Sequence, residues 1–273
     1  MPEKEHYRYP ERHILEPFRI AGNLYYIGDD DVCAHLIDSG DGLIVIDTGY
    51  PTAQALLIRS IYALGFDPKD VRIILHTHGH FDHFGATALL KTLSGAETYL
   101  GWKDAKMFRE RPELALCDDC VPYAAPEPFV PDHELHDGDV VRLGNVSITC
   151  FETPGHTEGT MSYFWELTEN GVSYRVGLLG GVGRNTLRKA FYEQYGVDGY
   201  RELFAESLAR MRKENVDIAL GTHTVQASFL TNLEKVRNDA AQNPWIDPIQ
   251  WTAFLDTMDR KLNELNTDPK EKI

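Results

Sequence analysis

The chain has few cysteines, a shortage of positive charge and no long apolar run, and each absence excludes a class of protein. Four cysteines in 273 residues are too few for a disulfide scaffold. No apolar run approaches the ~20 residues of a membrane span. The 27 Lys and Arg residues against 42 Asp and Glu give a formal net charge of −15, which disfavours binding to a nucleic-acid backbone. We therefore expect neither a nucleic acid nor a membrane as partner.

The N-terminus also lacks the apolar stretch of a signal peptide, since residues 1–10 are mostly polar, charged or aromatic. This predicts a cytoplasmic location, or a periplasmic or secreted one if a signal peptide was removed. The length and the ordinary apolar content favour one large domain over 1–273. Within it, 1–16 is expected to be a polar arm, and the apolar stripe near the C-terminus predicts a helix over 247–266 that packs on the core.

Strand and helix patterns alternate along the chain. Short β-type runs come first, and the glycines between them indicate an antiparallel meander: 24–27, 34–37 and 43–47. Apolar residues at helical spacing then predict a helix over 52–64. A proline-rich segment, 102–138, is expected to be a long irregular stretch.

A histidine-rich turn follows the apolar strand 71–75, and it reads His76-Thr77-His78-Gly79-His80-Phe81-Asp82-His83. Imidazole is the commonest metal ligand, and loops at strand ends are where sites are built. Clustered histidine and aspartate with open coordination positions suit Zn²⁺. The register His78-x-His80-x-Asp82-His83 leaves His76 on the strand, where we expect a structural role.

This HxHxDH pattern is the hallmark of the metallo-β-lactamase fold superfamily, which the chain resembles. The segment Thr153–Gly159 resembles the family's PGHT loop, and Leu220–His223 resembles the family's last metal histidine. The opening strands, which close on Ile46-Asp47-Thr48-Gly49, are similar too. The resemblance covers roughly 17–226. It implies an α/β fold, a four-layer αββα sandwich with its site at one edge of the two sheets.

Two metal ions that leave positions open for substrate need about six protein ligands. The chain offers six where strands give way to loops: His78, His80, Asp82, His83, His156 and His223. The resemblance assigns His78, His80 and His156 to one ion. It assigns Asp82, His83 and His223 to the other. It also implies two Zn²⁺ per chain and a hydroxide held by them, with Asp82 as the catalytic residue that orients this nucleophile and accepts its proton.

A missing residue narrows the choice among the branches of the superfamily. Most of its hydrolases carry an aspartate that bridges the two metals, on a strand between the PGHT loop and the last histidine. The subclass B1 β-lactamases place a cysteine there. Residues 176–185 contain no Asp, Glu or Cys. The chain therefore resembles subclass B3, which implies a zinc-dependent hydrolase of a cyclic amide of the β-lactam type.

Two features depart from subclass B3. The first is the missing signal peptide. The second is that glycines occupy 180, 181 and 183, where many B3 enzymes have serines that help to hold the substrate carboxylate. Arg184 is a candidate replacement, because a guanidinium binds carboxylate well; the alternative is an ordinary surface arginine. A single anionic ligand among six favours an anionic small-molecule substrate. Provided that the strand tolerates a side chain there, an aspartate introduced at Gly181 is expected to face the metals, to tighten the second ion and to weaken turnover of anionic substrates.

Three alternatives remain at this stage. The first is a cytosolic lactonase or other carboxylic-ester hydrolase on the same scaffold. The second is an iron enzyme of the superfamily, such as a sulfur dioxygenase or a flavodiiron-type oxidoreductase, although the chain has no room for a flavin domain. The third is a binding module with a relic site, which predicts broken ligands, whereas all six are present.

The pair Cys117-x-x-Cys120 is compatible with a small disulfide, half a metal site or two thiols. The absence of a second such pair excludes a zinc ribbon, and the absence of a surrounding βαβ pattern disfavours redox catalysis. The aromatic residues Trp102, Tyr123 and Phe129 flank the pair, and they either roof the site or pack the loop.

Overall fold

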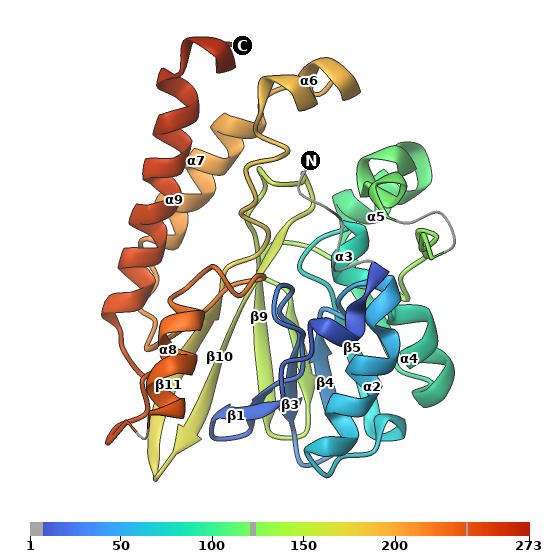
Figure 1. The fold of residues 1–273 in the computed structure, drawn as a ribbon, viewed down its shortest axis with the longest axis vertical. Helices are drawn as coiled ribbons and strands as arrows, with labels where there is room; N and C mark the ends of the chain where they lie inside the picture. Colours follow the sequence, from blue (N-terminus) through green and yellow to red (C-terminus); the bar gives the residue numbers. More distant parts are fainter. Residues whose placement is uncertain (1–7, 121–123, 239) are drawn as a thin grey trace.

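The computed structural model describes residues 8–120, 124–238 and 240–273, which form two β-sheets packed face to face between layers of helices (Figure 1). The first sheet comprises β1 (Phe18–Ala21), β2 (Leu24–Tyr26), β3 (His35–Asp38), β4 (Leu43–Ile46), β5 (Val71–Leu75), β6 (Glu97–Gly101) and β7 (His133–Leu135), in that order. The second comprises β8 (Val140–Leu143), β9 (Val146–Glu152), β10 (Met161–Glu169), β11 (Val172–Leu178) and β12 (Ile218–Leu220), in the order β12-β11-β10-β9-β8. This is the αββα architecture expected from the sequence.

The first sheet changes from antiparallel to parallel pairing along its width. Strands β1 to β4 form the predicted antiparallel meander, and β4 to β7 pair in parallel. Ile44 and Ile46 of β4 face the core between the sheets, while Leu43 and Val45 face the outer helices. Burial on both faces explains why this strand is apolar throughout. The parallel pairing places the ends of β4, β5 and β6 at one edge of the sheet.

The second sheet is built on a hairpin. Strands β10 and β11 pair antiparallel around Asn170 and Gly171, whose φ angles of 52° and 81° are those of a tight hairpin turn. Strand β12 then joins β11 in parallel. This pairing brings the loop after β12 to the same edge as the loop after β5.

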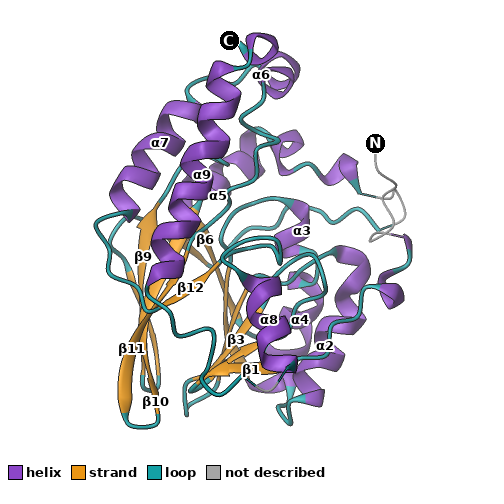
Figure 2. Cartoon of the chain, turned by 60° about the vertical axis from the view of Figure 1, so that its left-hand side comes forward, coloured by secondary structure: helices purple, strands orange, loops and turns teal. Residues whose placement is uncertain are grey.

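Helices cover the outer face of each sheet. The crossover helices α2 (Gln54–Ala63) and α4 (Thr87–Ser94) cover the first sheet, while α7 (Tyr200–Met211) and α9 (Ile249–Thr267) lie side by side on the second (Figure 2). Buried apolar residues of α9 recur every three or four positions: Trp251, Phe254, Leu255, Met258, Leu262 and Leu265. Shorter helices are α3 (Phe81–Phe84), α6 (Lys189–Tyr195) and α8 (Phe229–Arg237). In the described part of the chain, no helix is both long and apolar enough to span a membrane.

The segment 102–138 corrects a sequence-based expectation. It is not irregular throughout, because α5 (Trp102–Glu110) starts directly after β6 and is followed by the short 3₁₀ helices η4 (Pro112–Ala115) and η5 (Cys117–Asp119). The prolines of this segment all lie beyond residue 111, so none interrupts α5. The helix ends at Glu110, two residues before the first of them.

Candidate metal centre

The predicted ligands come from loops at the ends of strands. His78 and His80 lie between β5 and α3, and Asp82 and His83 lie on α3 itself. His156 lies in the loop between β9 and β10, and His223 follows β12. Because the first sheet is parallel at β4 to β6, its strand ends share one edge, where ligands of open α/β sheets ordinarily bind.

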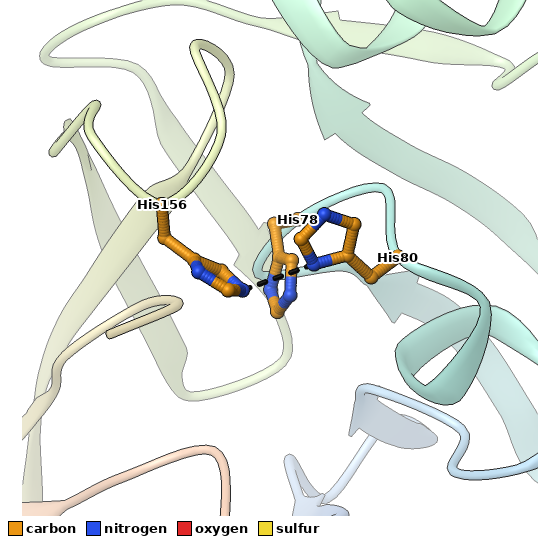
Figure 3. Close-up of side chains that lie close together, drawn as sticks. All are labelled: His78, His80 and His156. Atoms are coloured by element: carbon orange, nitrogen blue, oxygen red, sulfur yellow. Dashed lines mark hydrogen bonds between the residues drawn. The ribbon is translucent and has the colours of Figure 1, made fainter. Parts of the chain in front are cut away.

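Three of these histidines form one cluster, the three-histidine group: His78, His80 and His156. One side-chain nitrogen of each lies within 4.8 Å of the other two, and all three residues are buried. Figure 3 shows the three rings converging, with Nδ1 of His80 hydrogen-bonded to Nε2 of His156 at 2.9 Å. Imidazoles gathered away from water are a donor set that suits a zinc ion.

Asp82, His83 and His223 form a second cluster, the mixed group, whose ligand atoms also lie within 4.8 Å of one another. Asp82 Oδ2 lies 3.4 Å from Nε2 of His83 and 3.6 Å from Nε2 of His223. The two groups adjoin, since the ring centres of His78 and His83 are 4.1 Å apart. The six predicted residues are thus brought together as two adjacent groups of three.

Hydrogen bonds orient the imidazoles of the centre and, among the residues that the structure describes, leave Nε2 of His80 and of His83 without a hydrogen bond. Nδ1 of His83 donates to Asp47 Oδ2 at 2.9 Å, and Nδ1 of His156 donates to the carbonyl of Gly183 at 3.0 Å. Within the described residues, Nε2 of His80 and Nε2 of His83 are buried without a hydrogen-bond partner. Burial of an unpaired polar atom is costly, and a metal ion would remove that cost. The residues therefore fit a metal ion.

Electrostatics favour neutral histidines in the three-histidine group. Burial, together with the neighbouring imidazoles, lowers the pKa values of His78 and His156 well below the ordinary value. Burial lowers the pKa of His80 to about 4. Neutral imidazole is the form that binds a metal.

In the mixed group, the neighbouring charges outweigh the effect of burial on the pKa values. Burial favours the neutral form of His83, but Asp82 and Asp47 outweigh it and raise the pKa of His83 to about 10. Burial also opposes ionisation of Asp82, but the charges of His83 and His223 lower its pKa. These interactions favour an ionised Asp82 beside a protonated His83, so a metal ion bound by this group would displace a proton.

Gly181 lies directly against the three-histidine group. A Cβ atom at this position would lie 2.2 Å from Cδ2 of His156 and 3.1 Å from Nδ1 of His78. The position therefore faces the centre, as expected from the sequence. The condition attached to the aspartate substitution is not met, because there is no room for a side chain at Gly181 without moving His156.

We expect Gly181→Ala to displace His156 and to lower hydrolytic activity about a hundredfold, since a misplacement of about 1 Å costs roughly that factor in rate. Steady-state kinetics and zinc content measure the effect, and thermal unfolding shows whether the variant is folded. A folded Gly181→Ala protein with wild-type zinc content and wild-type activity would contradict this packing argument.

His76 is held by the fold and lies outside both groups. Its Nδ1 donates to the carbonyl of Tyr99 at 2.9 Å, and its Nε2 lies 2.7 Å from the hydroxyl of Thr87. Phe129 packs against the ring, with 4.9 Å between ring centres. With both nitrogens engaged, His76 has the structural environment predicted from the register.

A cavity of about 220 Å³ opens onto the two groups. Its lining among the described residues is His80, Phe81, Asp82, Leu116, Asp119, His156, Gly183, Asn185, Thr222 and His223. Arg184, the candidate for a substrate carboxylate, lies outside this set. Its Nη1 is 3.0 Å from Glu264 Oε2 on α9, in an ion pair near the surface. This geometry gives Arg184 a partner within the protein.

The Cys117-x-x-Cys120 segment and its aromatic neighbours do not extend the centre. Cys117 is a half-buried thiol, and no described metal-binding group contains it. Phe129 packs against Phe84 and Phe108, so it packs the loop. The indole of Trp102 donates to Glu152 Oε1 at 2.8 Å. Tyr123 lies outside the described residues.

Sequence reasoning missed three aspartates around the centre. Asp47 accepts hydrogen bonds from the backbone N–H and the hydroxyl of Thr77 as well as from His83. Asp31 Oδ1 lies 3.4 Å from Nδ1 of His223, and Asp104 bonds to loops on both sheets. Only Asp47 carried a signal in the sequence, as the residue that ends an apolar strand before Thr48-Gly49.

Comparisons with known proteins agree with this geometry. A subclass B3 metallo-β-lactamase of Bradyrhizobium japonicum superposes with a TM-score of 0.82 at 26% identity, over 92% of this chain and 94% of that one. A class B3 di-zinc metallo-β-lactamase from an Alaskan soil metagenome gives 0.79 at 26% identity, over 97% of each chain. Among curated proteins, a hydroxyacylglutathione hydrolase of Haemophilus influenzae is 28% identical over 165 residues, 59% of this chain and 73% of the relative.

The family comparison covers β3 to β10, with the HxHxDH turn and the PGHT-like loop. The family model of the metallo-β-lactamase superfamily matches residues 27–169, just over half of the chain. With hydrolases among its relatives, the chain is a metal-dependent hydrolase. By sequence, fold and the arrangement of its six ligand-type side chains, it belongs to the metallo-β-lactamase superfamily.

Proposed function

We propose that this protein is a di-zinc hydrolase of the subclass B3 type that opens a cyclic amide of the β-lactam class. The observation that carries the proposal is the ligand set: five histidines and one aspartate in two groups, with glycine where a bridging side chain would stand. In the proposed assignment, the three-histidine group holds one ion and the mixed group holds the other. The di-zinc structural neighbour supports this stoichiometry.

When bound, zinc ions lower the pKa of water to about 7 and polarise a carbonyl oxygen, so they supply a nucleophile at neutral pH. The protein's own side chains hold the metal ions in place and orient the attacking water. Asp82 lies between the imidazoles of His83 and His223 and lines the cavity. We assign to it the orientation of the attacking water and the acceptance of its proton.

The proposed substrate is a small anion. A single carboxylate among six ligands leaves the charge of two divalent ions largely uncompensated, which favours a carboxylate-bearing lactam. Asp119, at the rim of the same cavity, acts against an anion, and the described lining contains no lysine or arginine. The attraction for an anionic group therefore comes from the metal ions in this proposal.

A second candidate is the hydrolysis of a lactone or other carboxylic ester, which the hydroxyacylglutathione hydrolases among the relatives favour. In both reactions a nucleophile attacks a carbonyl carbon, so the same arrangement of side chains suits either reaction. The two reactions differ in the ring that is opened and in the leaving group, which is an amine nitrogen for a lactam and an oxygen or sulfur for an ester.

The test is steady-state hydrolysis of a chromogenic cephalosporin beside a panel of lactones and a hydroxyacylglutathione, with zinc content measured on the same preparation. We expect cephalosporin turnover that a chelator abolishes and added Zn²⁺ restores. Turnover of lactones or of the glutathione ester without turnover of the cephalosporin would replace the first candidate by the second. Turnover that survives complete removal of metal would contradict both.

A further inference from the structure

One buried carboxylate joins the two loops that supply the three-histidine group. Asp104 lies in the first turn of α5 and is fully buried. Its Oδ2 accepts from the N–H of Gly79 at 2.7 Å and from the hydroxyl of Thr157 at 2.8 Å. Its Oδ1 accepts from the N–H of Gly159 at 2.8 Å. A single side chain thus bonds to both loops, which belong to different sheets.

The donors to Asp104 stand next to the ligands. Gly79 lies between His78 and His80, and Thr157 directly follows His156. The approach is close enough to require glycine, since a Cβ atom at Gly159 would lie 2.2 Å from the amide nitrogen of Asp104. A Cβ atom at Gly79 would lie 2.8 Å from side-chain atoms of α5. Helix α5 is therefore packed against both ligand loops at the turns that carry the histidines.

We propose that Asp104 is a positioning residue that sets the distance between His156 and the pair His78 and His80, and thereby the metal affinity of the three-histidine group. This inference rests on the ligand set of the proposed function. The three bonds of Asp104 define what we call the Asp104 clasp. They do not reach α3 or the loop after β12 directly, so we expect the clasp to act on the three-histidine group and not on the mixed group.

Other bonds tie the same loops, but at their bases. The N–H of Met161 donates to the carbonyl of Thr77 at 2.8 Å, and the hydroxyl of Tyr163 donates to the carbonyl of His76 at 2.6 Å. These contacts join the two loops where they leave the strands, whereas the Asp104 clasp joins the turns that carry the histidines. Burial raises the pKa of Asp104 to about 6, and its three hydrogen-bond donors oppose this rise because they stabilise the ionised carboxylate.

The experiment measures zinc affinity by chelator competition in two backgrounds that each keep one group. His223→Ala leaves the three-histidine group intact, and His78→Ala leaves the mixed group intact. Asp104→Asn, which has one oxygen where the clasp needs two, is added to each. We expect a loss of zinc affinity of about tenfold to a hundredfold in the His223→Ala background, the range for residues that orient metal ligands. In the His78→Ala background we expect no change.

A second pair of variants tests the clasp independently, in case the Asp104→Asn protein fails to fold. Thr157→Val removes one donor of the clasp, whereas Thr157→Ser keeps the hydroxyl. We expect Thr157→Val to lower zinc affinity in the His223→Ala background and Thr157→Ser to restore it. Asp132→Asn is the matched control, because Asp132 accepts from the N–H and hydroxyl of Thr98 at the far end of β6. It should leave zinc affinity unchanged.

Unchanged affinity in both the Asp104→Asn and Thr157→Val proteins, or equal losses in the two backgrounds, would overturn the clasp. Failure of the His223→Ala protein itself to bind any zinc has a different meaning. That result would overturn the ligand set of the proposed function, and the clasp with it.

Discussion

Replacing His78 with alanine should strip the ion from the three-histidine group and lower kcat/KM by about a thousandfold or more. His78 is a buried member of the three-histidine group, with its ring beside those of His80 and His156 and beside that of His83 in the mixed group. A catalytic metal contributes several kcal/mol of transition-state stabilisation, and each 1.36 kcal/mol corresponds to a factor of ten in rate. Steady-state kinetics with zinc analysis on the same sample measures both effects.

The matched control is His76→Ala, which makes the same substitution two residues earlier in an equally buried position. Loss of its bonds to Tyr99 and Thr87 should cost about 1–3 kcal/mol of stability and leave the zinc content unchanged. If His76→Ala loses zinc while His78→Ala retains it, the register of the ligand pattern is wrong by two residues.

The second large effect is expected for Asp47→Asn. The carboxylate of Asp47 orients the ring of His83 and holds Thr77, the neighbour of His78, so it supports ligands of both groups. Asn has one acceptor oxygen, so part of this network is lost. We expect zinc affinity to fall about tenfold to a hundredfold. Chelator competition on the otherwise unchanged protein measures it.

The choice of asparagine isolates the hydrogen bonds from the backbone. Asp47 has a φ of 57°, a left-handed conformation that asparagine tolerates and alanine does not tolerate well. Asp38→Asn is a suitable control, since Asp38 accepts a turn hydrogen bond from the N–H of Gly40 far from the centre. Wild-type zinc affinity in folded Asp47→Asn would show that Asp47 does not support the ligands.

The sequence predicted the individual strands, the turns and the six candidate ligands from local patterns, and the two-sheet fold from the family resemblance that those motifs carry. The apolar run 71–75 marks a buried strand, and the spacing from His78 to His83 marks the turn that follows it. The turn at Asn170-Gly171 fixes the hairpin of the second sheet in the same way. These features need only neighbours within a few residues.

The features that the sequence did not predict depend on contacts between segments far apart in the chain. Asp104 meets Thr157 and Gly159 across more than fifty positions, and Arg184 meets Glu264 across eighty. No spacing rule connects such residues, so the sequence predicted neither the clasp nor the ion pair of Arg184 with Glu264. The steric limit at Gly181 is of the same kind, because it depends on the ring of His156 in another loop.

The central claim is that this chain holds two metal ions, one in each group of three side chains. The most direct measurement is the zinc content of the purified, zinc-reconstituted protein, determined by elemental analysis against a quantitative protein concentration. We predict two zinc ions per chain. A folded protein that binds no zinc, or that saturates with a single ion, would contradict the account.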